Sequence, residues 1–129
     1  MRLVPGQRIA VVGLSAKPDR PSYDVARTMQ RFGFDIVPVN PNFAGDEILG
    51  VRCVGSVAEI DGAVDIVDCF RKSEDMPGVA REVAQMSPRP RVLWMQLGVA
   101  SDEARKIAEA AGIEVVEDQC IKIAYMNQR

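Results

Sequence analysis

Two polar segments, 15–22 and 71–73, each follow an apolar run and combine serine hydroxyls with cationic side chains. Their cations are Lys17, Arg20, Arg71 and Lys72. Proteins surround phosphate with such groups, and the first turn of a helix adds unpaired backbone N–H groups. The two segments therefore predict an anion site, which fits several phosphates better than one.

The elements that would position these segments alternate between short β-branched runs and longer amphipathic runs. Strands are predicted at Arg8–Val12, Asp35–Val39, Val64–Phe70, Arg91–Gln96 and Glu114–Glu117. The alternation indicates an α/β fold that is Rossmann-like and doubly wound. Its five strands would form a mainly parallel sheet in the order 3-2-1-4-5, with helices on both faces. The length fits a single domain over residues 1–129.

Capping residues mark where the helices should begin and end. The first helix is expected to open between Arg20 and Ser22, to end at Gly33, and to bury Val25, Met29 and Phe32. Serines would cap the later helices: Ser56 with Glu59 in a capping box, Ser73, and Ser101. Residues 120–126 could form one last short helix.

The residues that follow the predicted strands are the candidate binding site, because ligands of open parallel sheets bind beyond the carboxyl ends of the strands. These residues are Gly13, Ser15, Lys17, Arg20, Ser22, Asn40, Pro41, Phe70, Arg71, Lys72, Ser73, Gln96, Leu97 and Gly98.

The turn after the first strand differs from the fingerprint of NAD-binding proteins. That fingerprint needs three glycines and an acidic residue at the end of the second strand, whereas this turn has only Gly13 and the second strand is followed by Asn40. An asparagine does not repel an additional ribose phosphate, so a phosphorylated adenosine fits better than NAD. Arg52 lies too far along the chain to take the role of the arginine that usually binds NADP.

Composition excludes several classes of function. The chain has no histidine, so it cannot form a histidine-based triad, a histidine general base or a phosphohistidine. Its cysteines, Cys53, Cys69 and Cys120, form no CxxC pair, and no metal site is predicted. A net charge of -2 disfavours nucleic-acid binding. The apolar run 9–14 is too short for a signal peptide or a membrane span, so a cytoplasmic location is expected.

Several sequence blocks together resemble a known family, the small stand-alone CoA-binding proteins. The blocks are GLSAKPDRPSYDVA, VPVNP, DIVDCFRKSEDMP, WMQLGV, AAGIEVV and a Cys-x-Lys-Ile ending. These proteins are related to the N-terminal CoA-binding domain of the succinyl-CoA synthetase alpha subunit. The resemblance extends from about Val4 to Met126 and departs from the usual ending at Gln119 and Ala124.

The resemblance implies a Rossmann-like protein that binds coenzyme A, with no established reaction. The leading hypothesis is a module without catalytic residues that binds CoA or an acyl-CoA as a carrier, sensor or accessory protein. The resemblance also implies that the loop after Gly13 holds phosphates, that Asn40 and Pro41 border the adenosine, and that Pro77 joins Phe70, Arg71 and Ser73 in the far wall. Two alternatives are a subunit of an acyl-CoA ligase or transferase that needs a partner chain, and, disfavoured by the turn, an NAD(P)-dependent oxidoreductase. A partner enzyme or a homo-oligomer fits this interpretation, and a disulfide between Cys120 and the CoA thiol is a further hypothesis.

Overall fold

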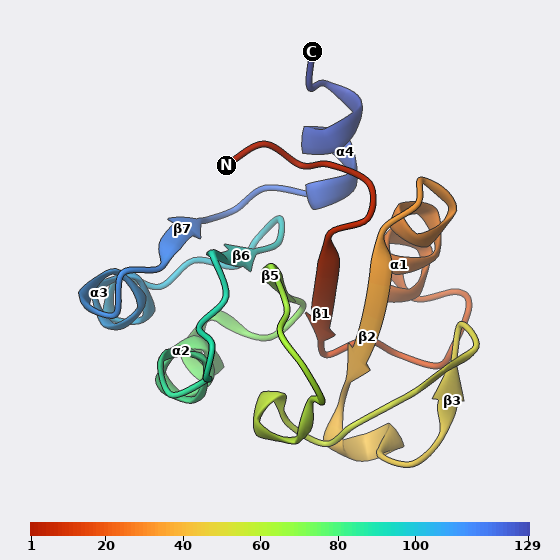
Figure 1. Ribbon diagram of the computed structural model, residues 1–129, viewed down its shortest axis with the longest axis horizontal. Helices are drawn as coiled ribbons and strands as arrows, with labels where there is room; N and C mark the ends of the chain where they lie inside the picture. The colour runs from red at the N-terminus through yellow and green to blue at the C-terminus, as the bar shows by residue number, and fades with distance from the viewer.

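A parallel five-stranded sheet with helices on both faces forms the centre of the protein, as the computed structural model of residues 1–129 shows (Figure 1). Its strands are β1 (Arg8–Val12), β2 (Asp35–Val39), β5 (Ile66–Cys69), β6 (Val92–Met95) and β7 (Glu114–Val116). Each observed strand coincides with a predicted one or lies inside it. The predicted α/β, Rossmann-like class is therefore confirmed.

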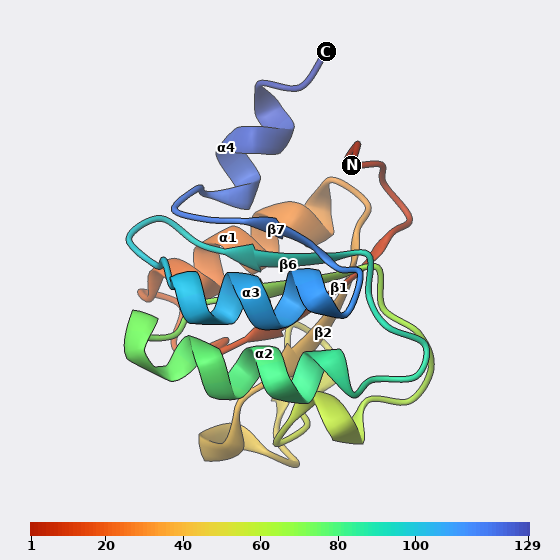
Figure 2. The same cartoon turned by 90° about the vertical axis from the view of Figure 1, so that its left-hand side faces the viewer.

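Helices cover both faces of the sheet, as Figures 1 and 2 show from two directions. One face packs against α1 (Pro21–Arg31) and α4 (Ile121–Met126), and the other packs against α2 (Met76–Ala84) and α3 (Asp102–Ala110). Because both faces are buried, successive strand residues alternate between two apolar cores, and the strands read as nearly continuous apolar runs. None of the helices combines the length and the hydropathy that a transmembrane span requires.

The predicted strand order, 3-2-1-4-5, is wrong. The observed order is β2-β1-β5-β6-β7, so the third long strand pairs with β1 instead of lying outside β2. The outer edge of β2 is already occupied, because the N–H of Val54 donates to the carbonyl of Pro38 (3.1 Å) and the N–H of Asn40 donates to the carbonyl of Val54 (2.9 Å). A small antiparallel hairpin of β3 (Glu47–Ile48) and β4 (Val51–Arg52) immediately precedes Val54.

The helix boundaries follow the predicted caps in some places and not in others. Gly33 and Gly112 adopt positive φ angles of 102° and 79° just after α1 and α3, as expected for helix ends. The segment after Ser56 is a single turn of 3-10 helix (Val57–Glu59), although its capping box is present. Phe32 lies beyond the end of α1 and is 38% exposed, contrary to the prediction that it is buried.

Ser73 does not cap α2, because another turn of 3-10 helix (Ser73–Asp75) precedes that helix. The hydroxyl of Ser73 instead accepts the backbone N–H of Ala100 (3.0 Å) and so ties the end of β5 to the loop after β6.

Candidate binding site

The observed strand order brings the ends of β1 and β5 together. The order reverses between these two strands, which is where ligands bind in folds of this class. Gly13 has φ 87°, and a Cβ atom at this position would lie 2.3 Å from the carbonyl oxygen of Phe70. A glycine is therefore required for the two strand ends to approach so closely, and this approach brings the loop after β1 next to Arg71.

Hydrogen bonds from within the chain hold the loop between β1 and α1. The N–H of Ser15 donates to Oγ of Ser22 (3.0 Å), and the N–H of Lys17 donates to Oγ of Ser15 (3.1 Å). Asn40 supports the loop from β2, because its Nδ2 donates to the carbonyl of Leu14 (3.1 Å) while its Oδ1 accepts the N–H of Asn42 (2.9 Å). The two serines and Asn40 thus fix the shape of the loop.

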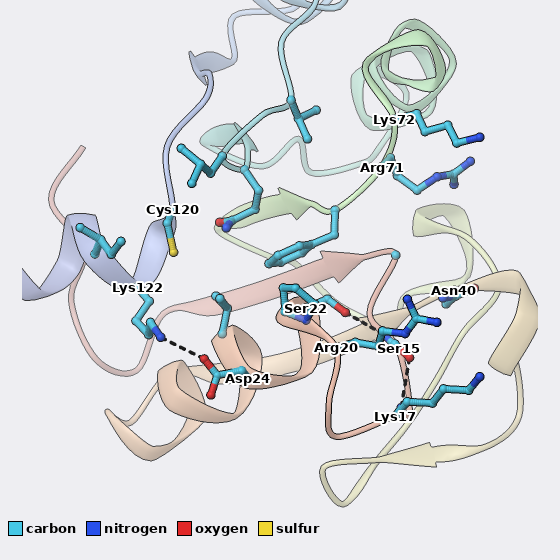
Figure 3. A pocket seen from close by; sticks show the side chains of 18 of the residues that line it. Ser15, Lys17, Arg20, Ser22, Asp24, Asn40, Arg71, Lys72, Cys120 and Lys122 are labelled. Carbon is cyan, nitrogen blue, oxygen red and sulfur yellow. Dashed lines mark hydrogen bonds and ion pairs between the residues drawn. The ribbon is translucent and has the colours of Figure 1, made fainter.

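Cationic side chains gather where this loop meets the end of β5 (Figure 3). Lys17, Arg20 and Lys72 form no ion pair, and Arg71 contacts Asp75 at 3.3 Å. The first turn of α1 lies at the same place and supplies backbone N–H groups and the positive end of the helix dipole. Charges left without partners here attract a ligand that carries several negative charges.

A cavity of about 940 Å³ opens beside these cations. Its volume lies in the upper part of the range of ligand-binding pockets, which is about 300–1,000 Å³. The predicted site residues that line it are Gly13, Ser15, Lys17, Arg20, Ser22, Asn40, Phe70, Arg71, Lys72, Gln96 and Leu97. Those that do not line it are Pro41, Ser73, Pro77 and Gly98.

The C-terminal segment forms the wall of the cavity opposite the cations (Figure 3). Oε1 of the buried Gln96 accepts the N–H of Ile121 (2.9 Å) and fixes the start of α4. Nζ of Lys122 donates to Oδ2 of Asp24 on α1 (2.9 Å), and this hydrogen bond is the main cause of the lowered pKa of Asp24. The two contacts hold Cys120 and Ile123 at the cavity.

The candidate list based on strand ends missed several residues of this wall, among them Asp24, Val25, Lys122 and Ile123. Asp24 and Val25 lie inside a helix, and α4 lies far along the chain from the loop that it faces. Cys120 is the exception, because the hypothesis of a disulfide with the CoA thiol requires it to lie near the ligand, and it does line the cavity. Spacing in the sequence gives no signal for the others.

A buried carboxyl group lies in β5 without a hydrogen-bond partner. Asp68 is paired in the sheet with Val11 and Trp94, and its Oδ1 is completely buried and contacts no donor. Burial raises the pKa of Asp68 well above 3.8, because the charged form would lose its hydration. Asp68 does not line the cavity, and no cluster of side chains suited to hold a metal ion is present.

Comparison with known proteins identifies the class of this fold and site. The family model described as "CoA binding domain" matches residues 7–126. The chain therefore belongs to the CoA-binding domain family.

Three particular proteins are similar to this chain. The uncharacterized protein YneT of Bacillus subtilis is 48% identical over 119 residues, which cover 92% of this chain and 85% of YneT. The solved structure of the Thermus thermophilus protein called cell-free ID.343 superposes with a TM-score of 0.88 at 35% identity, covering 94% of this chain and 89% of that one. An ADP-forming acetate–CoA ligase (II) of Archaeoglobus fulgidus is 32% identical over 103 residues, covering 78% of this chain and only 15% of the ligase.

Proposed function

We propose that the protein binds coenzyme A or an acyl-CoA in the cavity and acts as a binding module without catalysis of its own. The observation that carries this proposal is the group of unpaired cations beside the first turn of α1, at the point where the strand order reverses. CoA carries a diphosphate and a ribose phosphate at one end, which is the kind of multiply charged group that such a cluster attracts. Membership of the CoA-binding domain family supports the same ligand.

The side chains around the cavity support binding better than catalysis. Asp24 is the carboxylate that lines it, and this carboxylate is already tied to Lys122. General acid–base catalysis relies on a titratable group that is free to contact the reacting atoms. The lysines without an ion pair, Lys17 and Lys72, lie at the end where the phosphates would bind, so they are suited to electrostatic contact with the ligand.

A second candidate function is that of a subunit that supplies the CoA site to a ligase or transferase formed with a partner chain. The match to a small part of the Archaeoglobus fulgidus acetate–CoA ligase favours this alternative. An NAD(P)-dependent oxidoreductase has less support, because the turn at Gly13 lacks the other two glycines of the dinucleotide fingerprint.

Calorimetric titration with CoA, dephospho-CoA, NAD and NADP tests the proposal. We expect CoA to bind most tightly and dephospho-CoA more weakly, because the latter lacks the ribose phosphate. Tight binding of NAD without binding of CoA would overturn the proposal. The subunit alternative is tested by purifying the tagged protein from its native cells and assaying the complex for ATP-dependent formation of acetyl-CoA from acetate and CoA. Activity of the complex, absent from the protein alone, would establish the alternative.

A further inference from the structure

The two ends of the cavity differ in chemical character (Figure 3). The end at the loop after β1 carries the unpaired cations described above. The opposite wall contains α4, which contributes Ile123 and begins just after Cys120. Leu97 lies beside it, because it directly follows Gln96, whose side chain accepts the N–H of Ile121 at the start of α4. A single ligand that fills this cavity must therefore be strongly anionic at one end and apolar at the other.

Two apolar side chains of this wall are unusually exposed. Leu97 is 70% exposed and Ile123 is 52% exposed, whereas most of the large apolar side chains of the chain are buried. Leu97 lies directly after β6 and Ile123 lies in α4, so the two come from separate elements and line the same cavity. Exposed apolar side chains that border a pocket indicate a place where an apolar group is covered.

The charges at this wall are already neutralised. Lys122 and Asp24 contact each other at 2.9 Å, and both line the cavity. A carboxylate that arrived here would meet the negative charge of Asp24 and would have to draw Lys122 away from it. An uncharged group is not repelled by Asp24 and leaves its ion pair with Lys122 intact.

The orientation of the ligand rests on the proposed function. CoA carries its phosphates at one end and its thiol at the other, so phosphates bound at the cations direct the sulfur atom toward the wall of Leu97 and Ile123. We infer that this wall accommodates the group carried on sulfur, and that the ligand is a CoA thioester of a short, uncharged aliphatic acid. With free CoA, the two apolar side chains would stay exposed to water.

Calorimetric titration of the full chain with CoA, butyryl-CoA and succinyl-CoA tests the inference. The two thioesters have acyl chains of equal length and differ mainly in a terminal methyl or carboxylate. We expect butyryl-CoA to bind roughly three- to tenfold more tightly than CoA, because its alkyl chain is partly removed from water. Succinyl-CoA should bind more weakly than butyryl-CoA.

Three variants assign the effect to this wall. In Ile123→Ser, the ratio of butyryl-CoA affinity to CoA affinity should fall to about half its value or lower, because the alkyl chain loses apolar cover. Met126→Ser is the matched control, since Met126 is an exposed apolar residue of the same helix (63%) that does not line the cavity. In Met126→Ser, the ratio of butyryl-CoA affinity to CoA affinity should equal that of the unaltered protein. In Asp24→Asn, the ratio of succinyl-CoA affinity to butyryl-CoA affinity should rise roughly threefold or more, because Lys122 becomes free.

Failure of this inference and failure of the proposed function give different results. If CoA binds but butyryl-CoA binds no more tightly, or succinyl-CoA equals butyryl-CoA, the inference about the acyl group is wrong while CoA binding stands. Equal loss of the butyryl-CoA preference in Ile123→Ser and Met126→Ser would also overturn it. If none of the three compounds binds, the proposed function itself fails.

Discussion

The two ends of the cavity are built in different ways. The cationic end consists of the loop after β1 and the residues directly after β5. Main-chain pairing holds the two strand ends together, and side-chain hydrogen bonds of Ser15, Ser22 and Asn40 fix the loop. The opposite wall depends on α4, a short helix that is attached through side chains. Its start is fixed by Gln96, and Lys122 joins it to Asp24, which lies 98 residues earlier in the chain.

The two ends therefore differ in how their positions are determined and in which residues can be substituted. The position of the cationic end depends on the sheet, because the close approach of Gly13 to Phe70 brings the loop after β1 next to the end of β5. At the C-terminal wall, Ile123 is exposed and does not belong to either apolar core, so its substitution removes no contact of the sheet. We therefore expect the cationic end to determine whether a phosphorylated ligand binds and the C-terminal wall to determine which acyl group it carries.

At the cationic end, the largest effect on stability is expected for the substitution Gly13→Ala. The new methyl group would lie 2.3 Å from the carbonyl oxygen of Phe70, and the residue would have to keep a φ of 87°. We expect the free energy of unfolding to fall by about 1–2 kcal/mol from the backbone conformation and by about 1–3 kcal/mol more from overpacking. Urea unfolding measures the change.

Gly98→Ala is the matched control for this substitution. Gly98 also follows a strand and has φ 84°, but a Cβ there would meet no atom within 4 Å. It should therefore cost only the backbone contribution, about 1–2 kcal/mol. If the two variants lost equal stability, the close approach of β1 and β5 would not be what requires the glycine.

The placement of the cationic residues at the sheet edge could be predicted because it depends on local sequence. A strand followed by hydroxyls and cations places those side chains at the sheet edge whatever the strand order, so Lys17, Arg20 and Arg71 are found at the cavity although the predicted order was wrong. Hydrophobic periodicity indicates which residues form strands, but not which edges pair. The bridge of Val54 to β2 decides the order, and it is a long-range contact with no local pattern.

Most residues of the C-terminal wall could not be predicted from the sequence, because their contacts are long-range. Residues 120–126 were predicted to form a last short helix, and α4 confirms that helix. The sequence pattern did not predict what α4 packs against. Neither the hydrogen bond from Ile121 to Gln96 nor the ion pair of Lys122 with Asp24 follows from residue spacing. Ser73 illustrates a related limit, because its hydroxyl finds Ala100 in the folded chain instead of capping the next helix.

The next largest effect should come from Arg71→Ala, which removes a charge from the cationic end. If Arg71 binds a phosphate, the loss of one charged hydrogen bond should weaken CoA binding by roughly 1.5–3 kcal/mol, measured by calorimetry. Arg81→Ala is the control, since Arg81 also forms an exposed ion pair, with Glu103 at 3.1 Å, but lies away from the cavity. Equal CoA affinities of the two variants would remove Arg71 from the binding site.

Asp68 is a buried acid in β5, the strand that leads to Arg71 and Lys72 at the cationic end. Its raised pKa means that the folded state keeps the proton while the unfolded state releases it near pH 3.8. The contribution of Asp68 to stability is therefore complete below this pH and is lost as the pH rises toward the raised pKa. Asp68→Asn cannot ionise, so its free energy of unfolding should rise relative to the unaltered protein as the pH increases from 4 to 8.

Urea unfolding across this pH range, with Asp65→Asn as the control, checks the prediction. Asp65 is in the same segment, and its Oδ2 accepts the N–H of Arg8 (2.7 Å). Asparagine keeps an oxygen acceptor there, so this variant controls for the loss of one carboxylate. Parallel stability curves for Asp68→Asn and the unaltered protein would show that Asp68 is not a buried neutral acid.

The smallest effect on stability is expected for Lys122→Gln, at the C-terminal wall. Lys122 lowers the pKa of Asp24, so the ion pair stabilises the fold above the ordinary value of 3.8, and this contribution is lost as the pH falls through the lowered pKa. Because both side chains are partly exposed, the loss at neutral pH should be only about 0.2–1 kcal/mol and should shrink in high salt.

The more sensitive measurement for this variant is the pKa of Asp24 by NMR titration. It should rise toward 3.8 in Lys122→Gln and stay unchanged in Lys106→Gln, where an exposed lysine of α3 without an ion pair is removed. An unchanged Asp24 pKa in Lys122→Gln would mean that the ion pair does not hold α4 against α1 in solution. A raised Asp24 pKa together with nearly unaltered stability would instead show that this ion pair shapes the cavity wall and contributes little to the stability of the fold. That result is the one expected for the C-terminal wall.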